Sequence, residues 1–154
     1  MAKWHTQWWL QAWLRQDQGD MVWNALVIIT VLLPLASLTI DVPRYFTLRS
    51  RLQLAADGAV AAAARCVDVT HFQNVGETRL RSDCVATEPG FIFTQATQDL
   101  QGKGYAPTLG TIAVDEGDDT VSIDASGTTT LFFGLTPAFS VRVYAISTFR
   151  MDQR

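Results

Sequence analysis

Chemically reactive side chains are scarce in this sequence. Only two histidines, His5 and His71, stand among its 154 residues. The sequence contains no phosphate-binding glycine loop, no His-Glu-x-x-His motif and no nucleophile elbow. The chain is therefore expected not to be an enzyme and to carry no cofactor.

Metal ligands are equally sparse. His5 and His71 lie on opposite sides of an apolar run, Met21 to Ile40, and no third ligand stands at metal-binding spacing. The acidic run from Asp115 to Asp119 lacks the extended alternating ligands of a twelve-residue calcium loop, so it is expected to form a solvated turn. No metal site is predicted.

Basic residues are not in excess either. The formal net charge is −3 at pH 7, which provides no basic surface for a polyanion. Nucleic-acid binding is therefore not expected.

Charge is absent from Met21 to Ile40, a run of 20 residues bounded by Asp20 and Asp41. A helix rises about 1.5 Å per residue, so this run is about 30 Å long, which matches the hydrocarbon core of a bilayer. A secretory signal has a shorter apolar core, about 7–15 residues, followed by a small-x-small cleavage site. Here Asp41-Val42-Pro43-Arg44 follows instead, so the run is predicted to be a retained, single transmembrane helix.

Tryptophan is concentrated before this run. Indole rings favour the headgroup layer of a membrane, and Gln7, Gln11 and Arg15 form only a narrow polar stripe among the aromatic residues. Residues 1–19 are therefore predicted to form an interfacial helix, and docking of this wide apolar arc on a partner subunit explains it equally well. The membrane-interface or docking residues are Trp4, Trp8, Trp9, Trp13 and Trp23.

Flanking charge does not settle the orientation of the predicted span. Lys3 and Arg15 precede it, whereas Arg44, Arg49 and Arg51 follow it. Counting positive residues slightly favours a cytoplasmic C-terminal side, but the rule is weak for long translocated segments.

After the span, residues at alternating spacings of three and four predict one face of a continuing helix, in which Pro43 is free to introduce a kink. The side chains shrink from tyrosine and leucine to alanine along it, so a partner can approach closely. Packing on the protein's own sheet is favoured over packing against another protomer. The residues of this seam are Tyr45, Leu48, Leu52, Ala55, Ala59 and Ala62.

The residues around the span resemble a known family. Val31-Leu32-Leu33-Pro34-Leu35 is followed by Ile40-Asp41-Val42, Arg44-Tyr45 and the run Leu48-Arg49-Ser50-Arg51-Leu52-Gln53-Leu54-Ala55-Ala56-Asp57. This order is similar to the TadE/TadG-like pattern over about residues 26–65. The resemblance implies a pilin-like membrane protein of tight-adherence (Flp-type) pilus assembly, with a cytoplasmic N-terminus and an exported C-terminal domain.

Two positions depart from the pattern. Pro43 stands where such chains usually have glycine, and Asn24 stands where processed pilin-like relatives have a glutamate, five residues after the glycine matched by Gly19. That carboxylate serves in filament packing. Its absence favours a membrane-resident assembly component over a major pilin.

The C-terminal half predicts one helix and a small antiparallel sheet. Pro89 is expected to open the helix and Gly102 to end it, with Phe93, Ala96 and Leu100 on one face. Alternating patterns predict strands, with Ile112, Val114, Val121, Ile123 and Ala125 on the buried parity. The predicted strands are Thr111 to Asp115, Thr120 to Ala125, Thr128 to Phe133 and Ser140 to Phe149. The fold class is α+β, with the long pilin-like helix packed on the sheet.

Cys66 and Cys84 both follow the span and enclose 17 residues. On an extracytoplasmic side they are expected to form a disulfide, which contributes about 3 kcal/mol for a loop of this length. The alternative is a pair of free thiols.

The chain is thus predicted to comprise a Trp-rich helix, a span, a helix continuation and an extracytoplasmic domain, at residues 1–19, 20–41, 42–66 and 67–154. The expected location is the cell (inner) membrane. The expected partners are the lipid bilayer and other membrane subunits, reached through the Trp helix, the span and the Ala-rich helix. Two functions fit: a pilin-like component of a pilus system, or an accessory subunit of a large photosynthetic or respiratory membrane complex.

Overall fold

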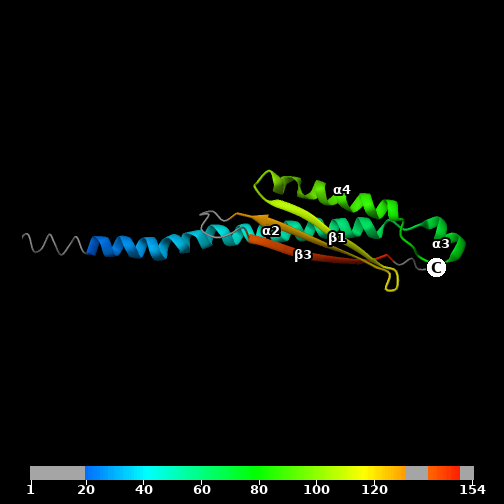
Figure 1. Cartoon of the computed structure of the whole chain (residues 1–154), viewed down its shortest axis with the longest axis horizontal. Coiled ribbons are helices and arrows are strands. Elements are labelled where there is room, and N and C mark those ends of the chain that lie inside the picture. Colours follow the sequence, from blue (N-terminus) through cyan, green and yellow to red (C-terminus); the bar gives the residue numbers. More distant parts are fainter. Residues whose placement is uncertain (1–19, 131–138, 150–154) are drawn as a thin grey trace, which may run out of the picture. The chain divides into compact units, whose positions relative to one another are not determined.

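A computed structural model describes residues 20–130 and 139–149 of the chain (Figure 1). The chain divides into two compact units, 1–42 and 43–154. Helix runs without a break from Asp20 to Ala64 and is followed by shorter helices and a sheet. The elements are the π-helical turn Ile28–Leu32, α2 (Leu33–Ala64), α3 (Val69–Val75), α4 (Ser82–Gln101), β1 (Ala106–Asp115), β2 (Thr120–Thr129) and β3 (Phe139–Thr148).

In the first unit the helix accommodates Pro34 by widening one turn. Proline has no N–H and its ring clashes with the carbonyl four residues earlier, here that of Thr30. The turn before it is π-helical, and the Leu33 N–H donates to the carbonyl oxygen of Ile28. The Thr30 hydroxyl also donates, to the Leu26 carbonyl at 2.6 Å. The helix therefore continues through the proline.

The second unit contains one antiparallel sheet in the order β1-β2-β3. Its strands pair over most of their length, and the register slips between Leu109 and Ile112 of β1. A Cβ at Gly110 in that irregular stretch would lie 3.0 Å from the carbonyl oxygen of Asp124, so the close approach requires glycine. Alternate residues of β2 and β3 face the core, namely Val121, Ile123, Ala125, Val141, Val143 and Ala145.

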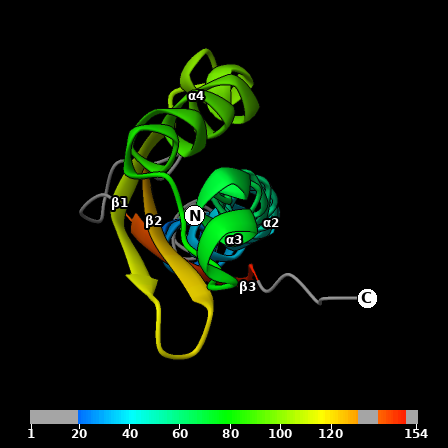
Figure 2. The ribbon, with the colours of Figure 1, turned by 90° about the vertical axis from the view of Figure 1, so that its right-hand side faces the viewer.

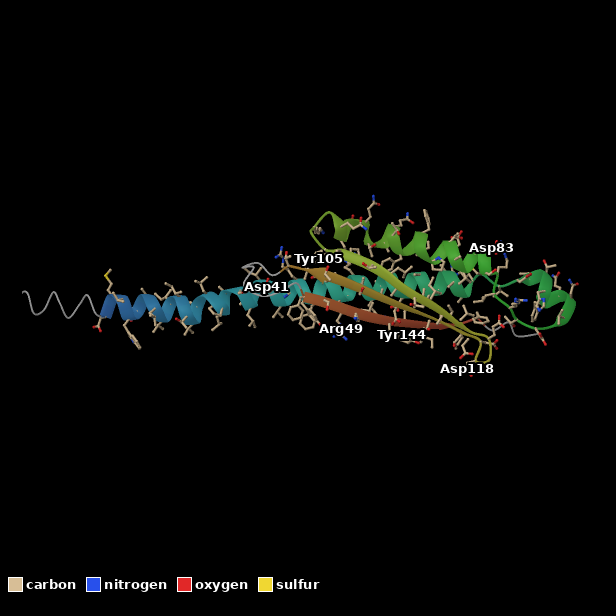
Figure 3. All side chains as sticks on the ribbon, viewed as in Figure 1. Asp41, Arg49, Asp83, Tyr105, Asp118 and Tyr144 are labelled. Atoms are coloured by element: carbon tan, nitrogen blue, oxygen red, sulfur yellow. A yellow bond between two sulfur atoms is a disulfide. The ribbon has the colours of Figure 1, made fainter. Side chains whose placement is uncertain are left out.

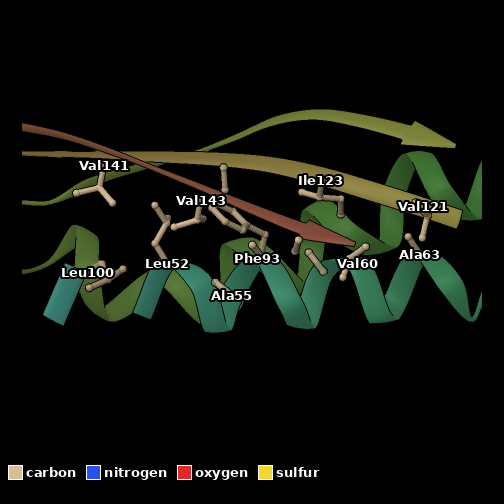
Figure 4. Packing of buried hydrophobic residues seen from close by; sticks show 14 of the residues in the cluster. Leu52, Ala55, Val60, Ala63, Phe93, Leu100, Val121, Ile123, Val141 and Val143 are labelled. Atoms are coloured by element: carbon tan, nitrogen blue, oxygen red, sulfur yellow. The ribbon is translucent and has the colours of Figure 1, made fainter. Parts of the chain in front are cut away.

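The core lies between this face of the sheet, α2 and α4 (Figure 4). A Cβ on Gly127 of β2 would lie 3.3 Å from Leu48 Cδ1, and one on Gly58 of α2 would lie 3.6 Å from Ile92 of α4. Small residues thus bring α2 close to both neighbours. In the end-on view α2 and α4 lie side by side next to the sheet (Figure 2). The α+β fold predicted from the sequence is confirmed.

Helix α4 begins earlier than predicted. It starts at Ser82, so Pro89 lies inside the helix instead of opening it. The proline costs one backbone hydrogen bond, but its ring is buried in the core. Thr97, not Ala96, joins Phe93 and Leu100 on the buried face, where its hydroxyl donates to the Phe93 carbonyl at 2.8 Å. Gly102 follows the helix with an αR backbone.

The strand predictions were also partly wrong. β1 begins at Ala106, five residues before the predicted start, and β2 runs on to Thr129, where a separate strand was expected. Thr130 follows β2 outside any strand. Residues 131–133 of the expected strand fall within 131–138, which lie outside the described residues. Val114 was expected to be buried but is 39% exposed, because it lines an open groove at the end of β1.

The core predicts a contrast between two leucines on one helix. Leu52 is fully buried, so Leu52→Ala should lower the free energy of unfolding by about 2–5 kcal/mol through lost apolar contact and a residual cavity. Leu54 is 70% exposed, and Leu54→Ala should change it by no more than about 0.5 kcal/mol. Urea unfolding of both full-length variants in the same detergent measures the difference; equal midpoints would contradict the packing.

Candidate assembly surface

The helix of the first unit is apolar on every side. It is long and apolar enough to cross a membrane, with a mean hydropathy of 2.3 in its most apolar stretch, none of which is buried. Trp23 is 66% exposed there, and the leucine, isoleucine and valine side chains from Val22 to Val42 are exposed as well. A helix with no polar face is expected in lipid or against other apolar helices.

The part of α2 in the second unit has two distinct faces. Leu48, Leu52, Ala55 and Ala59 of the predicted seam are buried in the core, and Tyr45 and Ala62 are half-buried at its margins. This face packs on the chain's own sheet and on α4 (Figure 4). The opposite face of this part of α2 is therefore left without cover from the sheet and α4.

The opposite face carries a row of residues, two of them large and apolar, that sequence reasoning missed. Phe46 and Leu54 are 60% and 70% exposed, with Ser50 between them at the same helical spacing. Asp57 is also exposed and Ala61 half-buried on this side. We call these five residues the outward stripe: Phe46, Ser50, Leu54, Asp57 and Ala61. Their three- and four-residue spacing was a signal in the sequence, but the buried seam on the other face was the stronger one.

Contacts of Gln53 and Tyr45, beside the outward stripe, hold α2 in place on the sheet. The side-chain amide of Gln53 donates to Asp57 at 2.9 Å and to the Tyr144 carbonyl of β3 at 3.2 Å. The Tyr45 ring meets Phe46 and Phe139 edge-on, with centroids 5.7 and 5.8 Å away. These contacts fix the rotation of α2 on the sheet, and with it the direction of the stripe.

A disulfide joins the end of α2 to the start of α4. Cys66 and Cys84 are bonded, with Cα atoms 5.7 Å apart, as predicted from the sequence. The Arg81 N–H donates to the Cys66 carbonyl and the Asp68 N–H to the Arg79 carbonyl, both at 2.8 Å. The short helix α3, which the sequence did not reveal, fills the loop; Asp68 caps it by accepting from the His71 N–H at 3.0 Å.

Exposed charged side chains near the disulfide line a groove at the end of β1. Arg81 donates to Asp83 at 2.7 Å, and this hydrogen bond lowers the pKa of the Asp83 carboxyl and raises that of Arg81. Arg79 lies 4.0 Å from Glu116. Across residues 20–130 and 139–149, no three metal-ligating side chains converge. The groove thus carries paired surface charges.

The predicted acidic turn lies between β1 and β2. The Asp115 carboxylate accepts from the backbone N–H groups of Gly117 and Asp118 at 2.9 and 3.3 Å. This is a side-chain-stabilised turn.

The helix that carries both the apolar segment and the outward stripe also carries the family signal. Residues 25–65 match the family model of putative Flp pilus-assembly TadE/G-like proteins. This segment is TadE/G-like. The match confirms the resemblance drawn from the sequence and runs from the apolar helix through to Arg65. Comparisons with curated proteins and with solved structures give no match.

Some predicted site residues lie outside the described part of the chain. These are Trp4, Trp8, Trp9 and Trp13. Their membrane or docking role, and the four-part division of the chain, stay predictions.

The disulfide provides a stability test. Replacing both Cys66 and Cys84 with alanine should lower the free energy of unfolding by about 3 kcal/mol, because the unfolded chain is no longer closed into a 17-residue loop. Denaturant unfolding of the full-length protein should show this loss, and reduction of the unmutated protein should reproduce it. An unchanged midpoint after both treatments would mean that the cross-link does not constrain this domain.

Proposed function

We propose that the chain is a non-enzymatic, single-span, pilin-like component of a tight-adherence (Flp-type) pilus system. The TadE/G-like segment supports the pilus context. The helix Asp20–Ala64 supplies a segment fit to anchor in a bilayer and then enters a small α+β domain. The domain has a structural role, and the apolar helix anchors it to the membrane.

The observation that carries this proposal is that the two parts of the TadE/G-like segment differ in which of their faces are exposed. Its first part is apolar all round, and its second part buries one face internally while exposing Phe46 and Leu54 on the other. Exposed apolar side chains in register on a helix favour packing against a second helix. The apolar helix and the outward stripe each offer helix surface for contact with partner chains.

An assembly role suits the chain better than a place as a major pilin. Asn24 occupies the position of the filament-packing glutamate of processed pilin-like relatives, and it is exposed on the apolar helix. An amide carries no charge, so it lacks the carboxylate that serves in filament packing. The protein therefore works in the membrane beside other pilin-like subunits.

We further propose that the domain lies on the extracytoplasmic side of the inner membrane, with the N-terminus in the cytoplasm. Disulfides persist in oxidising compartments, and the Cys66–Cys84 bond lies in the domain after the span. The three arginines after the span run against the positive-inside tendency, which is weak for a long translocated domain.

If the outward stripe binds partner chains, a charge placed in it should release them, whereas a charge at an equally exposed position elsewhere should not. Leu54→Asp places a charge in the stripe, whereas Phe91→Asp places one on α4 at a side chain that is similarly exposed, 65% against 70%. Mild-detergent purification should recover secretion-ATPase and pilin-like chains with the unmutated protein and with Phe91→Asp. Leu54→Asp should lose them while keeping the same thermal stability, because only the partner surface has changed.

Two results would contradict this proposal. Equal recovery of partners with both variants would remove the outward stripe from the interface. Recovery of a stoichiometric photosynthetic or respiratory complex in place of pilus chains would assign the protein to that complex as an accessory subunit.

Topology gives a separate prediction. After mild reduction, an impermeant thiol reagent should label Cys66 or Cys84 in cells whose outer layer admits it, because the domain lies outside the cytoplasm. A cytoplasmic protein with an exposed thiol serves as the negative control. Labelling that appears only after lysis would reverse the orientation.

A further inference from the structure

The hydroxyl groups of the uncharged run, Met21 to Ile40, are all bonded within their own helix. Thr30 and Thr39 donate to backbone carbonyls of the preceding turn at 2.6 and 2.8 Å. Ser37 donates to the Asp41 carboxylate at 2.8 Å. Because each hydroxyl proton already has an acceptor on the same helix, these side chains do not require a second chain.

Asn24 of the same run differs from these hydroxyls. Its side chain is exposed, and among the residues that the structure describes no hydrogen bond reaches its amide. Asn24 lies four residues beyond Asp20, about 6 Å along the helix. An amide without a partner in an apolar medium costs free energy. The indole N–H of Trp23 can only donate, whereas the Asn24 amide has donors and an acceptor to offer another molecule.

The neighbours of Asn24 on the helix surface are mostly large and apolar. Residues three and four positions away share its face, and Met21, Val27 and Ile28 are 77%, 42% and 52% exposed there. Asp20 also shares this face, at the charged boundary of the run, where water and salt screen it. Side chains project from both sides of this helix (Figure 3), and none of its most apolar stretch is buried. The surface around Asn24 is therefore suited to packing against a second apolar helix.

We propose that two copies of the chain pair through their apolar helices, with the two Asn24 amides hydrogen-bonded to each other. Copies inserted in the same direction are parallel, so a two-fold axis between them places both Asn24 side chains at the same depth. Each amide then donates one N–H to the oxygen of the other, because the group is complementary to itself. A single asparagine of this kind sets register and oligomeric state in paired helices.

The second copy is the occupant that the chemistry favours. A different chain would need its own donor and acceptor at the depth of Asn24, whereas a parallel copy of this chain necessarily brings both. The apolar side chains beside Asn24 exclude water from the pair of amides, which strengthens the hydrogen bonds between them.

This inference rests on the proposed span and not on the pilus assignment. If the span were wrong, alkaline carbonate would wash the full-length protein from membranes. A protein that stays in the membrane but remains monomeric is a different failure, which concerns the pairing alone.

The first experiment is sedimentation equilibrium of the full-length protein in a neutral detergent. Asn24→Leu keeps the approximate size of the side chain but removes its hydrogen bonds, and it should raise the dimer dissociation constant about fivefold. Asn24→Gln keeps the amide and should stay much closer to the unmutated protein. Thr39→Val is the matched control, because the hydroxyl that it removes is bonded within its own helix, and the dissociation constant should not change.

The second experiment locates the contact in native membranes. Ile28→Cys places a thiol on the face of Asn24, and Leu26→Cys places one on the opposite face; both native side chains are 52% exposed. A short bismaleimide joins free thiols and leaves the bonded Cys66 and Cys84 unmodified. With two epitope tags on two copies, Ile28→Cys should yield a doubly tagged dimer, Asn24→Leu should reduce its amount, and Leu26→Cys should yield little.

Three outcomes would overturn the proposal. An unchanged dissociation constant for Asn24→Leu would mean that the amide meets only water or headgroups. Equal weakening by Thr39→Val would mean that the effect is not specific to Asn24. A cross-linked product of Ile28→Cys that contains another chain in place of the second tagged copy would assign this face to a different partner.

Discussion

The packing of one face of α2 on the sheet fixes the rest of the structure. Leu48, Leu52, Ala55 and Ala59 are buried together, and the sheet meets them with Gly127, where a Cβ would lie only 3.3 Å from Leu48 Cδ1. Alanine on the helix and glycine on the strand allow a close approach that larger residues would prevent. Once this face is committed to the core, the direction of every other side chain on α2 follows from the helix period.

The burial of this face of α2 has two consequences. Phe46 and Leu54 must face outward, because the positions that point to the core are already occupied. The aromatic contacts of Tyr45 and the hydrogen bond from Gln53 to Tyr144 then hold the helix in this rotation. The same helix is apolar all round before Val42, so a segment long and apolar enough to cross a membrane and the outward stripe belong to one helix. The Cys66–Cys84 bond fastens the far end of that element to α4.

Sequence periodicity predicted what depends on local repeats. The seam from Leu48 to Ala59 was visible because three- and four-residue spacings persist through it, and the TadE/TadG-like resemblance was confirmed by the family match. The start of α4 was missed because Pro89 looked like a first residue, although burial of its ring makes it tolerable inside the helix. The start of β1 was missed because Pro107 and Gly110 are poor strand residues; here they lie on an edge strand with an irregular register. Helix α3 is only seven residues long, too short for a periodic signal.

Features that depend on long-range register could not be predicted. Strand pairing brings the starts of β1 and β3 together, although these segments are remote in the chain. The outward stripe likewise becomes meaningful only when the opposite face of α2 is known to be buried.

The central claim is that α2 keeps one face for its own domain and offers the other to partner chains. The most direct measurement is a photo-cross-linking scan in native membranes, with a reactive residue placed in turn along α2 and, for comparison, at the exposed position Gln98 of α4. The account predicts cross-links to other chains at Phe46, Ser50, Leu54 and Ala61, and none at Leu48, Leu52 or Gln98. Cross-links to other chains from α4 but not from the outward stripe would contradict it.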